Sequence, residues 1–98
     1  MTINKTLEGT ELEIAVSGRL DTSTAPELEA EIKQSIGGIT KLIFDFAGLE
    51  YVSSAGLRVL LSAQKAMNRQ GSMVLRNVSE PIMEVFEVTS FTDILTIE

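Results

Sequence analysis

Two adjacent serines, Ser53 and Ser54, are the residues of this chain whose type and spacing best suggest chemistry. They follow an apolar segment and precede a run with helical spacing, so they lie where the chain turns into a helix. A serine oxygen at that position can cap free backbone N–H groups of the first turn. A phosphate attached there would meet the same N–H groups and the positive end of the helix dipole. The pair therefore indicates a phosphorylation switch more than an enzyme.

The sequence contains no evident general base that could activate either serine for catalysis. There is no His and no Cys, whereas an activated serine needs a base within hydrogen-bond reach. Lys65 lies about three helical turns beyond Ser54, roughly 16 Å away. No Gly-rich phosphate loop and no metal-ligand spacing occurs. We expect no enzymatic activity, no cofactor and no metal, while nucleotide binding without catalysis stays open.

Composition and charge limit the kinds of binding partner that this chain can have. Ninety-eight residues with 44% hydrophobic residues fit a single domain, residues 1–98, with one core. The net charge of −6 argues against nucleic acid and anionic membranes as partners, and no apolar run approaches the ~20 residues that span a bilayer. The absence of Cys and of a recognisable signal sequence favours a reducing, cytoplasmic setting.

The charges are unevenly distributed along the chain. No Asp or Glu lies between Tyr51 and Ser79, a segment that nevertheless holds several basic residues. Lys65 and Arg69 can complement the C-terminal end of a helix dipole. Arg58 falls near the start of the same helix, where a cation is unfavourable, so it needs another reason. Contact with an acidic partner or with a phosphate would supply one.

Hydrophobic periodicity and turn residues divide the chain into strands and helices. Thr24 to Glu27 has the form of a capping box at the start of the first helix, and the Gly48–Ser54 segment is read as a loop. A continuous apolar run at 42–46 suits a central strand covered on both faces. The predicted strands are 3–7, 12–16, 42–46, 73–75 and a last edge strand Leu95–Ile97, and the helices are about 25–36, 54–70 and one that Ser79 opens.

The resulting order, β-β-α-β-α-β-α-β, predicts an α/β fold with a mixed central sheet of about four to five strands and helices packed on it. Functional loops of such sheets tend to follow the carboxyl ends of parallel strands, as the Gly48–Ser54 loop does. Asp45 lies within the apolar strand. It is either a half-exposed strand residue or a buried acid bonded to backbone N–H groups of the next loop.

The segment Leu42–Leu61, with Val16–Glu27 ahead of it, resembles the STAS domain. It looks most like the small free-standing anti-sigma factor antagonists of bacteria, and the resemblance covers nearly the whole chain. It implies one mixed sheet with helices grouped around it. It also implies a protein-binding switch. We expect the chain to be a monomer or a weak dimer.

In that family the unphosphorylated domain binds a serine kinase that doubles as an anti-sigma factor. The kinase phosphorylates a serine at the start of the second helix, the complex dissociates, and a metal-dependent serine phosphatase restores the domain. The resemblance therefore implies that this chain antagonises a serine-kinase anti-sigma factor and is reset by a phosphatase. A second reading keeps the fold without the switch, as an adaptor or regulatory subunit of a sensory or anion-transport complex.

The family motif is commonly Asp-Ser-Ser/Thr-Gly-Leu, with the phosphate on the residue after Asp. Aligned on Gly56 and Leu57, the acceptor is Ser54, with Ser53 as the alternative. The family Asp falls on Ser53 and the second hydroxyl on Ala55, so this chain lacks the fixed negative charge. Asp21 matches an acidic position that lies before the first helix in this family. It is either an ordinary turn residue or a support for the acceptor. The residues expected at the partner-binding site are Asp21, Ser53, Ser54, Gly56, Leu57, Arg58 and Lys65.

Overall fold

The computed structural model describes all residues from Met1 to Glu98. It contains one five-stranded sheet with neighbouring strands in the order β1-β2-β3-β5, and β4 pairs with β2. β1 and β2 are antiparallel, whereas β2 is parallel to β3 and β4, and β3 is parallel to β5. The predicted α/β fold with a mixed central sheet is confirmed. The strands are β1 Thr2–Glu8, β2 Glu11–Leu20, β3 Lys41–Asp45, β4 Leu49–Val52 and β5 Ser72–Arg76.

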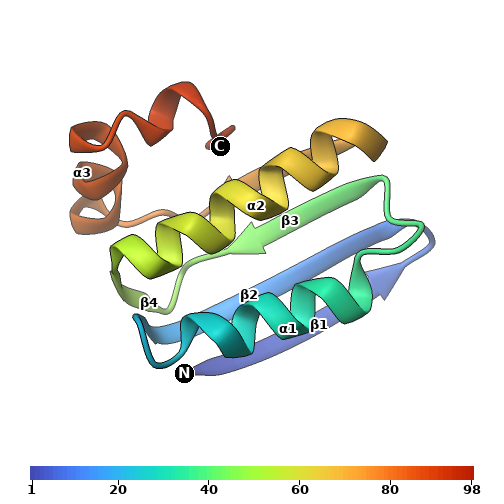
Figure 1. Ribbon diagram of the computed structural model, residues 1–98, viewed down its shortest axis with the longest axis horizontal. Coiled ribbons are helices and arrows are strands. Elements are labelled where there is room, and N and C mark those ends of the chain that lie inside the picture. Colours follow the sequence, from blue (N-terminus) through green and yellow to red (C-terminus); the bar gives the residue numbers. More distant parts are fainter.

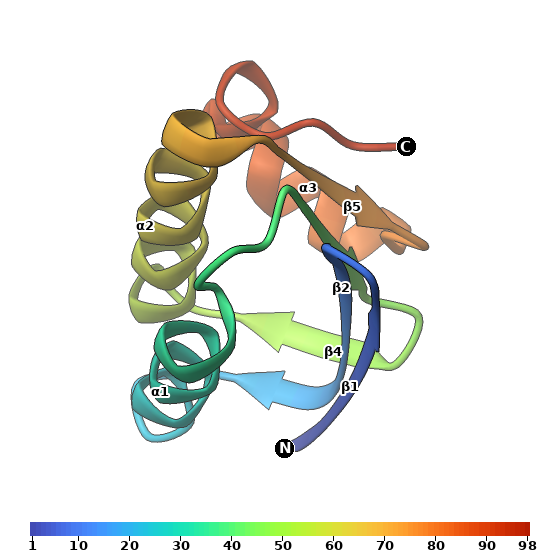
Figure 2. The same cartoon turned by 90° about the vertical axis from the view of Figure 1, so that its right-hand side faces the viewer.

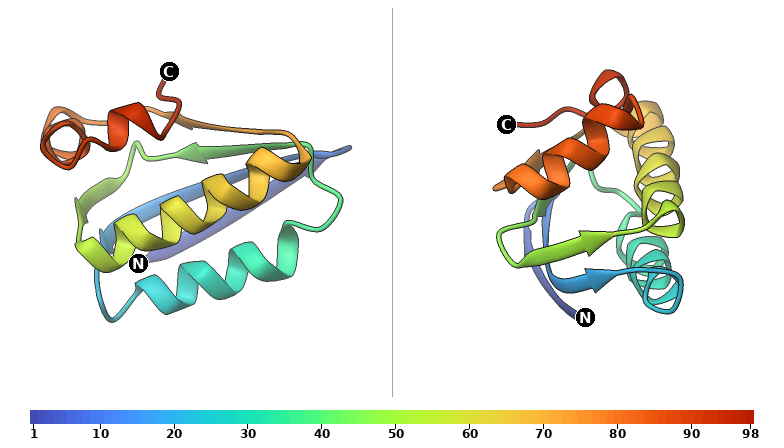
Figure 3. Two further views of the ribbon diagram at one scale, coloured as in Figure 1. Left: turned by 45° about the horizontal axis from the view of Figure 1, so that its top comes forward. Right: turned by 90° about the vertical axis from the view of Figure 1, so that its left-hand side faces the viewer.

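The helices are α1 Ala25–Ser35, α2 Ser54–Gln70 and α3 Glu80–Val88, followed by the 3-10 turn η1 Phe91–Asp93. Helices α1 and α2 lie side by side along one face of the sheet (Figure 1), and a view along the sheet shows that the other face carries no helix (Figure 2). Helix α3 flanks the β5 side of the molecule (Figure 3). None of the helices has both the length and the apolar character that crossing a bilayer requires.

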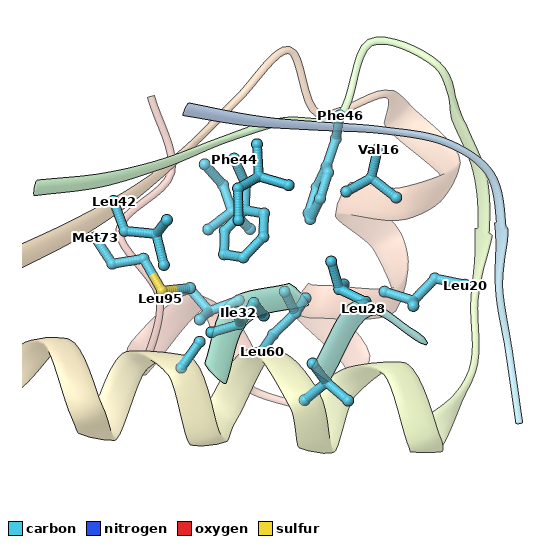
Figure 4. Packing of buried hydrophobic residues seen from close by; sticks show 14 of the residues in the cluster. Val16, Leu20, Leu28, Ile32, Leu42, Phe44, Phe46, Leu60, Met73 and Leu95 are labelled. Atoms are coloured by element: carbon cyan, nitrogen blue, oxygen red, sulfur yellow. The ribbon is translucent and has the colours of Figure 1, made fainter. Parts of the chain in front are cut away.

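One cluster of 23 buried residues fills the space between the sheet and the helices. Alternate residues of β2, together with inward-facing residues of β3, point at α1 and α2, as the period of a strand dictates. Figure 4 shows Leu20 and Leu28 meeting from β2 and α1, with Leu60 of α2 beside them. Phe44 and Phe46 pack with their ring centroids 5.5 Å apart. The core thus fixes both helices over the strands that carry the candidate site.

Two details of the predicted element order are wrong. The Gly48–Ser54 segment is not only a loop, because it contains β4. After β3 the chain makes a tight turn, in which the Leu49 N–H donates to the Phe46 carbonyl at 3.0 Å, and then pairs with the end of β2. Only the first and last of the four β4 residues are buried. The segment therefore shows neither the alternation nor the continuous apolar run that identifies a strand.

The second correction concerns the predicted edge strand Leu95–Ile97. This segment forms a single isolated bridge, in which Ile97 is the parallel partner of Leu75. Leu75 is bonded on both sides, since its N–H donates to Thr96 and its carbonyl accepts from Glu98, each at 2.9 Å. The 3-10 turn η1 directly before it leaves too few extended residues for a strand. Leu95 is nevertheless buried in the core, which explains its apolar pattern.

Candidate functional site

The residues predicted to form the site converge because two parallel strands end together. Leu20, the last residue of β2, is the register partner of Val52, the last residue of β4. The Ser53 N–H then donates to the Leu20 carbonyl at 2.9 Å. Asp21 therefore begins the connection that leaves β2, at the same edge of the sheet where Ser53 and Ser54 leave β4. This edge is the carboxyl end of both strands, where α/β folds place their functional loops.

Ser53 is the N-cap of α2, as predicted. Its backbone is extended, with φ −95° and ψ 175°, and its hydroxyl accepts from the Gly56 N–H at 3.3 Å. Its carbonyl accepts from the Leu57 N–H at 2.9 Å, which begins the helix. The side chain is half-buried. The Ser53 hydroxyl oxygen thus caps the helix terminus. Loss of a serine cap lowers the free energy of unfolding by about 1 kcal/mol.

Ser54, the first residue of α2, differs from its neighbour in both exposure and bonding. It is exposed, and its hydroxyl makes no hydrogen bond within the chain. It lies at the positive end of a helix of 17 residues, whose first N–H groups have no partner within the helix. An anion on this hydroxyl would meet favourable partial charges. Of the two serines, Ser54 is therefore the one that is free to react.

Asp21 organises the turn between β2 and α1. Its Oδ1 accepts from the Ser23 N–H at 3.0 Å, the Ser23 hydroxyl at 2.8 Å and the Thr24 N–H at 3.1 Å. These bonds, with the Ser23 hydroxyl contributing most, hold the pKa of Asp21 below its ordinary value. The turn-residue interpretation of Asp21 is confirmed. None of its bonds reaches Ser53 or Ser54, so a supporting role near the acceptor stays a prediction.

The predicted capping box at the start of α1 is wrong. Thr24 is the N-cap but its side chain makes no cap hydrogen bond. Instead its hydroxyl accepts from the Asp21 N–H at 2.8 Å and donates to the Arg19 carbonyl at 2.7 Å. The hydroxyl thus ties the turn back to β2, and the Glu27 N–H, which a capping box would give to this hydroxyl, donates to the Thr24 carbonyl at 3.0 Å.

Gly56 and Leu57 lie beneath the site and not on its surface. Leu57 is 7% exposed. A Cβ atom on Gly56 would lie 2.7 Å from Cγ of Leu20 and 2.9 Å from Cγ2 of Val52. Because α2 presses these two residues against both strands, they offer little surface to a partner, and contact with a partner stays a prediction. Their role is to let the first turn of α2 approach the ends of β2 and β4 closely.

Arg58 and Lys65 are exposed on the outer side of α2, together with Arg69. None of the three takes part in an ion pair, although five ion pairs form elsewhere in the chain. Ser54 shares this side of the helix, because residues four, seven and eleven positions apart lie near one line on an α-helix. The outer side of α2 is therefore a row of unpaired cations that begins at the exposed serine.

A shallow groove runs between α1 and α2 next to this row. Arg58 lines it from α2, and Glu29 lines it from α1. The carboxylate of Glu29 is 3.6 Å from the Lys33 amine one turn along α1. The groove continues toward the far ends of both helices, past Val59 and several small or aliphatic residues.

One pair of surface residues near the site was not predicted. The guanidinium of Arg19 lies 4.2 Å from the centroid of the Tyr51 ring, and Tyr51 is 40% exposed. The Arg19 Nε is also 3.6 Å from the Asp21 carboxylate. Register pairing of β2 with β4 brings Arg19 and Tyr51 together. Because β4 was not predicted, this neighbourhood had no signal in the sequence.

Asp45 combines features of the two interpretations offered for it. It is half-exposed, and its Oδ1 accepts from the Ala47 N–H of the next loop at 3.0 Å and from the Asn77 amide at 2.9 Å. These bonds, that from Asn77 first, hold the pKa of Asp45 below its ordinary value. Their contribution to stability is full above the ordinary carboxyl pKa and is lost as pH falls through the lowered one. The role of Asp45 is thus to join two loops.

No group of three potential metal-ligating side chains occurs in the structure. The site offers an exposed hydroxyl at a helix N-terminus, a neighbouring capped serine and an adjacent row of cations. It contains no base bonded to Ser54 and no enclosed substrate cavity beside it. This arrangement suits modification by another protein and binding to a protein surface.

A family model and several known proteins match this chain. A family model for the STAS domain matches residues 2–98. The anti-sigma-B factor antagonist of Listeria monocytogenes is 34% identical over 90 residues, which cover 89% of this chain and 78% of the relative. The solved structure of the unphosphorylated anti-sigma factor antagonist SpoIIAA has a TM-score of 0.85 at 21% identity, over 99% of this chain and 88% of that chain. Phosphorylated SpoIIAA of Bacillus has a TM-score of 0.77 at 21% identity, over 99% and 91% of the two chains.

Proposed function

This chain belongs to the STAS domain family, and from this premise we propose that it is an anti-sigma factor antagonist controlled by phosphorylation. Residues 1–98 act as a single domain in the bacterial cytoplasm. Unphosphorylated, the domain binds a serine-kinase anti-sigma factor, and phosphorylation of Ser54 releases it. A serine phosphatase removes the phosphate. Relatives with substantial sequence identity are named as antagonists, which are regulatory binding proteins and not enzymes.

The observation that carries the proposal is the contrast between the two serines. The Ser53 hydroxyl accepts a bond from Gly56 and is half-buried, whereas the Ser54 hydroxyl is exposed and unbonded. A kinase must reach the hydroxyl and turn it toward the transferred phosphoryl group. Phosphorylating Ser53 would first remove a helix cap, while phosphorylating Ser54 requires no native bond to break. This contrast supports Ser54 as the acceptor, which is also the residue that the resemblance to the family motif implies.

The departure from the family motif has a physical consequence at the same place. Ser53 stands where relatives commonly carry Asp, so no fixed carboxylate lies beside the acceptor. The cap is retained because serine and aspartate both accept from the first-turn N–H groups. A phosphate on Ser54 would therefore meet less repulsion from its neighbour than it would in a chain with Asp there. The switch is compatible with this sequence.

The partner is expected to contact the outer side of α2. Arg58 and Lys65 lie there without acidic partners in this chain. Unpaired cations that follow the exposed serine along α2 suit a partner surface that carries carboxylates, because charge complementarity guides encounter and orientation. An added phosphate would place a charge of about −1.5 to −2 at the N-terminal end of that contact.

The proposal is tested by locating the phosphate. We expect the serine kinase encoded nearest to this gene to transfer one phosphate from ATP to the wild-type chain, and fragment masses to assign it to Ser54. The Ser54→Ala variant should receive none, and the Ser53→Ala variant should still receive one. Phosphate on Ser53 would move the acceptor by one residue. Binding without any phosphate would instead favour an adaptor that has no switch.

A further inference from the structure

Arg58 is a cation whose guanidinium makes no ion pair and no hydrogen bond in the chain. It is the fifth residue of α2, just beyond the first turn, where the helix dipole gives a cation no favourable interaction. It is exposed and takes part in none of the ion pairs of the structure. A cation without an ion pair or hydrogen bond in the unphosphorylated chain is available for a role in another state of the protein.

The charged groups around Arg58 are already engaged with others. Glu29 lines the same groove from α1 but is 3.6 Å from Lys33. Asp21, in the turn before α1, accepts bonds from its own turn and is approached by Arg19. The helix itself carries no acid from Ser54 to Gln70. In the unphosphorylated chain, the guanidinium is therefore free to turn toward a new anion.

The spacing of Ser54 and Arg58 is that of a helical ion pair. Residues four apart on an α-helix have their Cβ atoms about 5–6 Å apart. The acid lies N-terminal to the base, which is the favourable orientation. A guanidinium matches a phosphate with two parallel hydrogen bonds. We infer that Arg58 acts as an intramolecular clamp for phosphorylated Ser54, an inference that rests on the proposed function of this serine.

The clamp would make phosphorylation change two charges of the binding surface at once. The phosphate adds negative charge at Ser54, and the same event withdraws the Arg58 guanidinium from the surface offered to a partner. Both groups satisfy each other within α2, so the fold needs no rearrangement. An aspartate at position 54 has a shorter reach and a single charge. It should therefore engage Arg58 less completely than phosphoserine does.

The test installs phosphoserine at position 54 by semisynthesis, so that no kinase is needed. Phosphorus NMR then follows the second ionisation of the phosphate with pH, whose ordinary pKa is about 6. We expect this pKa to be lower in the wild-type chain than in Arg58→Gln by roughly 0.3 pH units or more. Lys65→Gln, which removes an equal charge from the same side of α2 about three turns away, should leave it close to the wild-type value.

A nitrogen-15 spectrum gives a second readout. The Nε–H signal of Arg58 should move when Ser54 is phosphorylated, while that of Arg69 should not. Equal phosphate pKa values in the wild-type and Arg58→Gln chains would overturn the clamp, as would an unmoved Arg58 signal. Neither result would bear on whether a kinase modifies Ser54 or whether the phosphate releases the partner, so the two proposals fail separately.

Discussion

Replacing Ser54 with aspartate is expected to weaken binding to the kinase-type anti-sigma factor by at least about 30-fold, since like charges or a desolvated anion at an interface cost several kcal/mol. The same substitution should leave the fold intact. A carboxylate in the first turn of α2 interacts favourably with the helix dipole, and Ser54 is exposed without a native bond to lose. We expect the melting temperature to stay within about 5 °C of the wild-type value. Calorimetric titration and thermal unfolding by circular dichroism measure the two quantities.

Two control variants separate the position of the charge from its mere presence. Ser72→Asp adds the same charge at the exposed start of β5, at the opposite end of the parallel strands, and should keep the affinity within about twofold. Ser54→Ala removes the hydroxyl without adding charge and should bind like the wild-type chain. A stably folded Ser54→Asp protein with wild-type affinity would contradict the proposed switch.

Replacing Gly71 with alanine is expected to have the largest effect on stability. Gly71 follows the last residue of α2, and a Cβ atom there would lie 1.8 Å from the carbonyl oxygen of Thr40. That oxygen accepts from the Ser72 N–H at 3.0 Å. The backbone at Thr40 therefore cannot move away from Gly71 without breaking this bond at the start of β5. Backbone atoms have no rotamer by which to retreat. We expect a loss of about 3 kcal/mol or more in the free energy of unfolding, measured by urea denaturation.

The glycines after α1 provide matched controls for this substitution. A Cβ atom on Gly37 or Gly38 would meet nothing within 4 Å. Gly38 has a φ of 78°, so Gly38→Ala should cost about 1 kcal/mol through left-handed backbone strain alone. Gly37→Ala should change stability by no more than about 1 kcal/mol. A loss for Gly71→Ala no greater than that for Gly38→Ala would show that close contact at Thr40 does not hold α2 in place.

The parts of the fold that could be predicted are those with strong local signals. The bounds of α2, residues 54–70, match the observed helix, because Ser53 caps one end, Gly71 follows the other and the buried stripe keeps its period. The central position of β3 follows from its continuous apolar run. β4 could not be predicted, since pairing with β2 after a tight turn determines it more than its own four residues do. The opposite error was made after η1, where the apolar residues that predicted an edge strand contribute to the core and form only a single bridge.

The candidate site was predictable where a residue acts through its own helix terminus. The cap at Ser53 and the exposure of Ser54 both follow from their order at the start of α2. Helical spacing places Leu57 in the buried stripe of α2, and this is confirmed. The burial of Gly56 depends on how α2 lies across two strands, which sequence spacing does not give. The Thr24 hydroxyl was assigned to the first turn of α1, whereas it bonds to the backbone of Arg19 and Asp21 before the helix. The predictions that differ from the structure are those that depend on contacts between separate helices and strands, which residue types alone do not reveal.

The most direct test of the central claim is to watch the complex after ATP is added. The purified complex of this chain with its kinase-type anti-sigma factor would be followed by native mass spectrometry, with fragment masses assigning the phosphate. The account predicts that the complex disappears as fast as free chain phosphorylated on Ser54 appears, and that the Ser54→Ala complex persists under the same conditions. A complex that stays assembled while Ser54 is fully phosphorylated would contradict it.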